Sequence, residues 1–105
     1  KSHVLNLCLA YGSRHEIVNA INKLVEKGIK VDEETFSSYL DTAGLADPDL
    51  IVRASGEQRL SNFMLWQSAY AEFYFPKKYW PDFDAKTVDE CISVYQKRKR
   101  RFGKI

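Results

Sequence analysis

The stretch Leu50-Ile51-Val52-Arg53-Ala54-Ser55-Gly56-Glu57-Gln58-Arg59-Leu60-Ser61 joins a short apolar run to a dense polar cluster. Two arginines, two serines, a glutamate and a glycine fall between Arg53 and Ser61. Arg53 and Arg59 offer forked cationic donors, and glycine lets the backbone approach a ligand closely. These groups suit a phosphate or a diphosphate. A polar turn with a surface salt bridge would use the same residue types, so the pattern alone leaves both interpretations open.

Two apolar runs are predicted to be buried strands, one at residues 49–53 and one at Val4–Ala10. The second run is followed by a glycine turn and a helix predicted over Arg14–Lys27, and this order is the opening of a βαβ unit. Ligands gather at the carboxyl ends of the strands in such sheets. We therefore expect the turn at Gly12–Arg14 to share one sheet edge with Arg53–Ser61.

Local signals predict the remaining elements. Ser13 and Glu16 form a capping-box pattern that predicts Ser13 as an N-cap, and Gly28 is a natural C-cap. The other predicted elements are helices over Glu33–Leu40, Asn62–Ala71 and Ala85–Arg101 and a short strand over Glu72–Phe75. Ser61 would cap the helix from Asn62, whose positive end would favour an anion at the polar cluster. The predicted fold class is α/β, a mostly parallel sheet flanked by helices.

Length and composition point to one globular domain over residues 1–105, with 45% hydrophobic and 29% charged residues. The net charge of +2 does not indicate nucleic-acid binding. The Lys97–Arg101 run keeps a nucleic-acid-binding domain as a weaker alternative, although most such runs are solvated helix faces. Cys8 and Cys91 are predicted to be reduced residues in or near the core. No stretch approaches the roughly 18 apolar residues of a membrane span.

Several motifs, in order along the chain, resemble those of the cis-prenyltransferases, the family of undecaprenyl diphosphate synthase. They are Tyr11-Gly12-Ser13-Arg14, the run from Arg53 to Gln67, Tyr70-Ala71-Glu72-Phe73-Tyr74-Phe75, Trp80-Pro81-Asp82-Phe83 and Arg100-Arg101-Phe102-Gly103. The resemblance implies a dimeric enzyme that requires Mg²⁺. It would condense isopentenyl diphosphate with an allylic diphosphate, such as farnesyl or geranyl diphosphate, and form a cis double bond.

The resemblance also implies roles for single residues. Arg53, Arg59 and Ser61 match the positions that bind the isopentenyl diphosphate headgroup. Glu72 matches a position linked to Mg²⁺; the pattern alone favours a strand-edge residue that reaches solvent. Residues Arg101 to Gly103 match the Arg-x-Gly ending of the family, which is associated with reaching across the dimer to the partner's diphosphate site.

The chain also departs from the family pattern. The family's N-terminal Asp-Gly-Asn-Gly-Arg-Trp motif, which supplies the main Mg²⁺ ligand, is absent, and Ala10 and Ala54 replace a common asparagine and threonine. We therefore expect this chain to be the C-terminal part of a synthase. We also expect that it contains no catalytic residue and has no synthase activity alone. A non-catalytic partner subunit of a heteromeric enzyme is the alternative. A cytoplasmic homodimer is expected, with membrane contact only through a lipid product.

Overall fold

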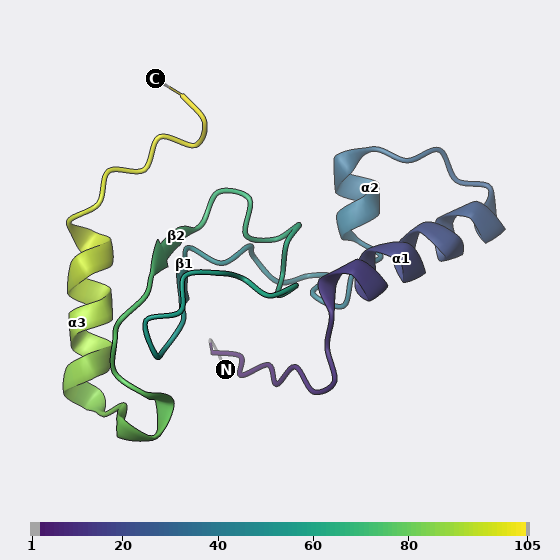
Figure 1. Cartoon of the computed structure of the whole chain (residues 1–105). Coiled ribbons are helices and arrows are strands. Elements are labelled where there is room, and N and C mark those ends of the chain that lie inside the picture. The colour runs from purple at the N-terminus through teal and green to yellow at the C-terminus, as the bar shows by residue number, and fades with distance from the viewer. Residues whose placement is uncertain (1–2, 105) are drawn as a thin grey trace. The chain divides into compact units, whose positions relative to one another are not determined.

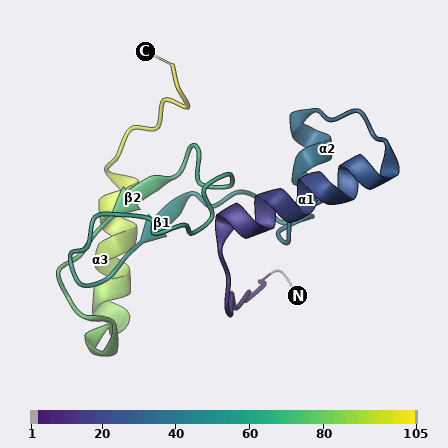
Figure 2. The same cartoon turned by 45° about the vertical axis from the view of Figure 1, so that its right-hand side comes forward.

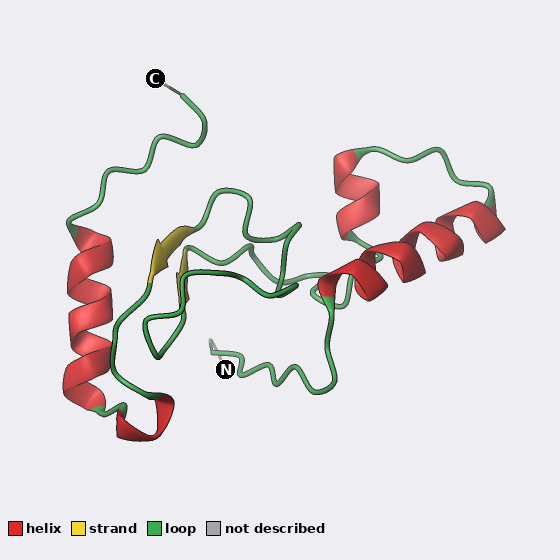
Figure 3. Ribbon diagram, viewed as in Figure 1, coloured by secondary structure: helices red, strands yellow, loops and turns green. Residues whose placement is uncertain are grey.

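The computed structural model describes residues 3–104, whose elements are shown in Figures 1 and 3. They divide into two compact units. Unit 1 comprises residues 3–45 and 62–66, and unit 2 comprises residues 46–61 and 67–104. No helix in the described part of the chain is both long and apolar enough to cross a membrane.

Unit 1 is built on α1 (Ser13–Lys27), which ends at Gly28 in the left-handed conformation (φ 63°), as predicted. The predicted N-cap is wrong, because Gly12 occupies that position and Ser13 is the first helical residue. The first N–H groups of α1 are instead satisfied by Asn62. Its carbonyl accepts from Ser13 N at 2.7 Å, and its side-chain Oδ1 accepts from Arg14 N at 2.9 Å.

The core of unit 1 lies between α1 and α2 (Glu33–Ser37). Asp32 caps α2 by accepting a 2.7 Å hydrogen bond from Thr35 N. Four side chains form the buried cluster: Ala20, Leu24, Phe36 and Leu40. Trp66 packs edge-to-face on Phe36, with ring centroids 4.7 Å apart. These contacts bury the face of α1 that carries Ala20 and Leu24, while the neighbouring Val25 is 71% exposed.

The predicted strand at Val4–Ala10 is wrong. All of these residues are exposed, and Leu5 keeps 86% of its surface accessible. A strand needs backbone partners, and the sheet found within residues 3–104 contains only β1 (Leu50–Val52) and β2 (Glu72–Tyr74). Cys8 is therefore exposed rather than near the core, whereas Cys91 is buried as predicted, and both thiols are free.

The predicted helix over Asn62–Ala71 is also wrong, since this stretch forms bends and turns. Asn62 and Met64 have φ values of 67° and 48°, outside the helical region. The backbone groups that a helix would pair internally are used elsewhere: the Asn62 carbonyl accepts from Ser13 N, and Leu65 N donates to Ser13 Oγ at 3.0 Å. Packing onto α1 therefore replaces the helix.

Unit 2 contains the sheet. β1 and β2 are parallel, with Leu50 opposite Glu72 and Val52 opposite Tyr74, as the α/β prediction requires. Figure 2 shows α3 (Ala85–Gln96) beside the two strands, and Tyr74 OH donates to Glu90 Oε2 at 3.1 Å. The helix ends at Gln96 rather than Arg101, so the basic run does not lie on a helix face.

Candidate functional site

The Arg53–Ser61 loop begins where β1 ends and is held to the segment that follows β2. Three backbone hydrogen bonds of 2.8 to 3.1 Å hold it, from Arg53 to Tyr74, from Ser55 to Lys78 and from Gly56 to Pro76. Ser55 and Gly56 both have positive φ (71° and 68°), which reverses the chain at the carboxyl end of β1. The loop therefore starts from a fixed position at the end predicted to hold a ligand.

Arg53 closes this loop by joining its two ends. Its Nη1 donates to Ser61 Oγ at 2.8 Å and to the Arg59 carbonyl at 2.9 Å. Arg53 is half-buried, while Arg59 and Ser61 are exposed. Three of the residues predicted to bind a diphosphate thus lie together on one loop.

Arg59 also forms an ion pair with Glu57, through Nη2 and Oε1. The two side chains are 62% and 42% exposed, and exposed pairs of this kind contribute about 0–1 kcal/mol. The surface salt bridge of the alternative interpretation is therefore present. It is compatible with an anion site, because an incoming anion can compete with a weak, solvated carboxylate.

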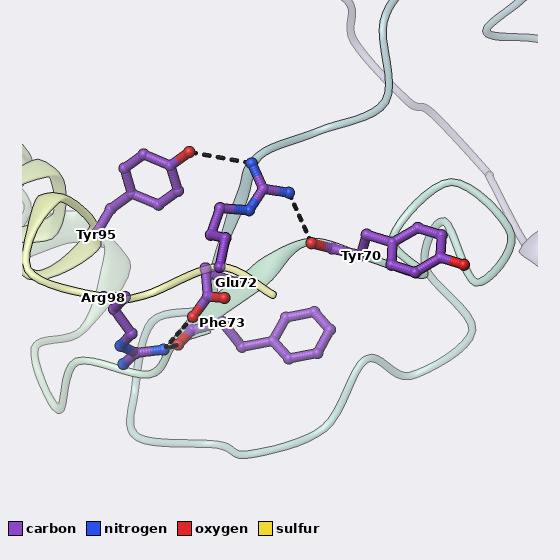
Figure 4. Close-up of polar contacts among 6 residues, drawn as sticks. Tyr70, Glu72, Phe73, Tyr95 and Arg98 are labelled. Carbon is purple, nitrogen blue, oxygen red and sulfur yellow. Dashed lines mark hydrogen bonds and ion pairs between the residues drawn. The ribbon is translucent and has the colours of Figure 1, made fainter. Parts of the chain in front are cut away.

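Glu72, the predicted Mg²⁺ ligand, begins β2. Arg98 Nη1 donates to the Phe73 carbonyl at 2.6 Å and lies 3.4 Å from Glu72 Oε1 (Figure 4). Within residues 3–104, no group of three or more His, Cys, Asp or Glu side chains is arranged to hold a metal ion. Mg²⁺ is commonly bound by one or two carboxylates with substrate phosphates and water. A lone carboxylate such as Glu72 is compatible with this mode of binding.

Arg101 and Gly103 lie in a tight turn after α3. Lys104 N donates to the Arg101 carbonyl at 2.9 Å, and the two central residues, Phe102 and Gly103, have φ values of 51° and 80°. Two consecutive positive φ angles define a turn that favours glycine. This geometry gives a physical reason for the glycine in the Arg-x-Gly ending.

The arginine before this turn has a role that the sequence did not reveal. Arg100 Nη1 donates to Asp49 Oδ1 at 2.6 Å and to Tyr95 OH at 3.1 Å, and its Nη2 donates to the Tyr70 carbonyl at 2.7 Å. Figure 4 shows the Tyr70 and Tyr95 ends of these contacts. The predicted basic run is therefore partly docked onto unit 2.

Glu16 is a second residue that the sequence did not single out as a site residue. It is 5% exposed and accepts hydrogen bonds from Tyr11 OH and, at 2.8 Å, from Asp41 N. Burial raises the pKa of Tyr11 to about 12, and the bond to Glu16 acts in the same direction. In the sequence, Glu16 was noted only as the partner of Ser13 in a capping-box pattern.

The turn at Gly12–Arg14 belongs to unit 1, and the expectation that it shares a sheet edge with the Arg53–Ser61 loop depended on a strand at Val4–Ala10 that does not form. Ser13 is fully buried, and its Oγ accepts from Leu65 N. The Ser13 hydroxyl thus has a structural partner within unit 1.

Comparison with known proteins adds independent information. The prenyltransferase family model described as undecaprenyl diphosphate synthase matches residues 1–103. The isoprenyl transferase of Oceanobacillus iheyensis is 50% identical over 109 residues, which cover 97% of this chain and 43% of that protein. The isoprenyl transferase of Geobacillus kaustophilus is 53% identical over 107 residues, which cover 95% of this chain and 42% of that protein.

A solved structure of lavandulyl diphosphate synthase from Lavandula x intermedia, in complex with dimethylallyl diphosphate, superposes with a TM-score of 0.85. It shares 45% sequence identity and covers 91% of this chain and 44% of the lavender chain. The chain belongs to the undecaprenyl diphosphate synthase family of isoprenyl transferases. It spans less than half the length of the curated relatives it matches.

Proposed function

We propose that this chain forms the isopentenyl diphosphate-binding part of an isoprenyl transferase, which condenses isopentenyl diphosphate with an allylic diphosphate such as farnesyl diphosphate. One observation carries the proposal: Arg53 bonds to Ser61 Oγ and to the Arg59 carbonyl at the carboxyl end of β1. Family membership supports the reaction class.

The donors of this loop suit a diphosphate. Both bonds from Arg53 use Nη1, and within residues 3–104 its Nη2 and Nε donate to no protein acceptor. Ser61 Oγ accepts from Arg53, so its own hydrogen remains available for a phosphate oxygen. Arg59 adds a second guanidinium, and paired guanidinium donors bind phosphate oxygens strongly. The lavender relative, whose solved complex contains dimethylallyl diphosphate, supports a diphosphate ligand.

The chemistry assigned to these residues is positioning. Arg53, Arg59 and Ser61 would hold the diphosphate of isopentenyl diphosphate so that its alkene faces the first carbon of the allylic substrate. A carbon–carbon bond forms there, the allylic carbon–oxygen bond breaks, and one proton leaves the condensed product. Glu72 begins β2, so as one ligand of Mg²⁺ it would neutralise the charge of a diphosphate that reaches the start of this strand.

The position of the C-terminal turn supports a role across a homodimer. Arg100 docks on Asp49 and Tyr70, which precede β1 and β2, whereas Arg53 follows β1. The three residues of β1 lie between Asp49 and Arg53, and the four rises of about 3.3 Å from one to the other span about 13 Å. Arg101 and Gly103 are thus held near the opposite strand ends from the Arg53–Ser61 loop, so a diphosphate contact from them is more readily made to a partner's loop.

Titration calorimetry with isopentenyl diphosphate tests the proposed ligand. Arg53→Ala and Arg59→Ala should each weaken binding by about tenfold, the cost of a lost charge-assisted hydrogen bond. Lys97→Ala is the matched control, because it removes an exposed cation outside the loop. Unchanged binding in both arginine variants would contradict the assignment.

We also propose that the 105-residue chain alone does not elongate allylic diphosphates, because the family's aspartate motif is not in its sequence. An elongation assay with farnesyl diphosphate, isopentenyl diphosphate and Mg²⁺ checks this. Polyprenyl product made by the purified chain would refute the proposal.

A further inference from the structure

The segment that follows α3 presents its basic side chains in alternation. Arg98 and Arg100 hydrogen-bond to the sheet region, although the Arg98 side chain stays 38% exposed, while Lys97, Lys99 and Arg101 are exposed. The segment leaves α3 through a turn at Lys97 and a bend at Arg98, where Arg98 N donates to the Tyr95 carbonyl at 3.0 Å. The run therefore has a docked side and a free side.

Arg100 makes the most extensive of these contacts. Its side chain is only 18% exposed, and it bonds to Asp49 before β1, to Tyr70 before β2 and to Tyr95 on α3. Three parts of the chain, distant in sequence, thus meet at one guanidinium. A planar fork with several donors can join them in a way that a single ammonium group cannot.

The same guanidinium supports the Arg101–Lys104 turn. Its Cζ lies 4.4 Å from the ring centroid of Phe102, and this ring lies 6.1 Å from the ring of Tyr70. Phe102 has a φ of 51°, a left-handed conformation that is strained for a residue with a Cβ. Contacts of the Phe102 ring with Arg100 and Tyr70 offset this strain and keep the turn in one place.

We propose that Arg100 is a positioning residue that fixes the Arg101–Lys104 turn, so that the exposed Arg101 and the backbone of Gly103 form a preformed diphosphate-binding element. The diphosphate part of this inference rests on the function proposed above. The positioning part depends only on the contacts of Arg100, so the two parts can fail separately.

Amide hydrogen exchange at Lys104 tests the positioning, because its N–H bonds to the Arg101 carbonyl only when the turn is formed. Arg100→Lys keeps the positive charge but replaces the planar guanidinium and its several donors with a single ammonium group. It should speed amide exchange at Lys104 by about tenfold. Lys99→Gln, at the exposed neighbour, should leave it unchanged. Tyr95→Phe removes one acceptor while keeping the ring, and provides a milder variant in case Arg100→Lys lowers the melting temperature of the whole chain.

Titration with isopentenyl diphosphate then separates positioning from a purely structural role. We expect Arg100→Lys and Arg101→Gln to weaken binding by a similar factor, with only Arg100→Lys speeding exchange at Lys104. Unchanged exchange in both Arg100→Lys and Tyr95→Phe would overturn the inference. Unchanged affinity in Arg101→Gln would instead overturn the diphosphate role of the turn, and the exchange data would still decide whether Arg100 holds it.

Discussion

Arg53 Nη1 lies 2.8 Å from Ser61 Oγ, so a hydrogen bond joins the first and last residues of the loop that follows β1. The same nitrogen donates to the Arg59 carbonyl, which places the second arginine of the loop beside the first. The loop is therefore closed by its own cation, and its donors are gathered before any ligand is considered.

This closure predicts that Arg53→Lys will not be a conservative change. A lysine keeps the charge, but its ammonium group cannot bond to Ser61, the Arg59 carbonyl and a phosphate with one planar fork. We expect the affinity for isopentenyl diphosphate to fall about tenfold. Arg98→Lys is the matched control, since it makes the same replacement in unit 2 outside the loop. Titrations without Mg²⁺ should show a loss of affinity only at Arg53.

The ion pair between Glu57 and Arg59 predicts the opposite effect on binding. Glu57→Gln removes a negative charge from the loop and releases Arg59 from its exposed partner. We expect inorganic pyrophosphate to bind a few-fold more tightly, with a larger gain at low ionic strength. Asp89→Asn removes a charge from the exposed side of α3 and serves as the control. Weaker binding in Glu57→Gln would show that Glu57 helps to form the site.

Most of the confirmed predictions depend on neighbouring residues in the sequence. The apolar run at residues 49–53 was enough to place a strand, which the structure forms as β1 (Leu50–Val52) directly before the loop that carries Arg53, Arg59 and Ser61; that these three residues bind a ligand stays a prediction. Likewise, Gly28 and Asp32 mark the end of α1 and the start of α2 by local rules of capping.

The wrong predictions depend on partners that are distant in sequence. The apolar run Val4–Ala10 has the composition of a strand, but composition cannot supply the neighbouring strand that it needs. The run after Ser61 has helical spacing, yet Ser13, about fifty residues earlier, takes up its backbone groups. Arg100 was overlooked for the same reason, since nothing near it in sequence indicates Asp49 or Tyr70.

Gly12 is the glycine whose replacement should be costly for steric reasons. A Cβ at this position would lie 2.9 Å from Asn62 Nδ2, although the backbone φ of −147° suits any residue. Gly12→Ala must therefore displace the side chain that accepts from Arg14 N. We expect urea unfolding to show a loss of about 1–3 kcal/mol.

A double-mutant cycle isolates this cause. In an Asn62→Ala background the clash disappears, so Gly12→Ala should cost much less than in the wild type. Gly44→Ala is the matched control: Gly44 has a φ of 85°, and a Cβ added there would meet nothing within 4 Å, so its cost comes from backbone strain alone. That cost should be the same with or without Asn62→Ala. Additive effects of Gly12→Ala and Asn62→Ala would contradict the steric explanation.

The hydrogen bond between Tyr11 and the buried Glu16 predicts a dependence of stability on alkaline pH. Burial raises the pKa of Tyr11 to about 12 from its ordinary 10.0, so the folded chain holds this proton more tightly than the unfolded chain. The corresponding stability is complete below about pH 10 and is lost as the pH rises from about 10 to about 12. Urea unfolding at several pH values in this range measures the loss.

Tyr11→Phe should reduce this pH dependence while lowering stability at neutral pH, because Glu16 then keeps only part of its set of donors. Tyr79→Phe is the matched control, since Tyr79 is 65% exposed and its replacement should leave the alkaline loss as in the wild type. The difference in unfolding free energy between the wild type and Tyr11→Phe should therefore narrow above pH 10. A constant difference from neutral pH to about pH 12 would show that the Tyr11 proton is held no more tightly in the folded state.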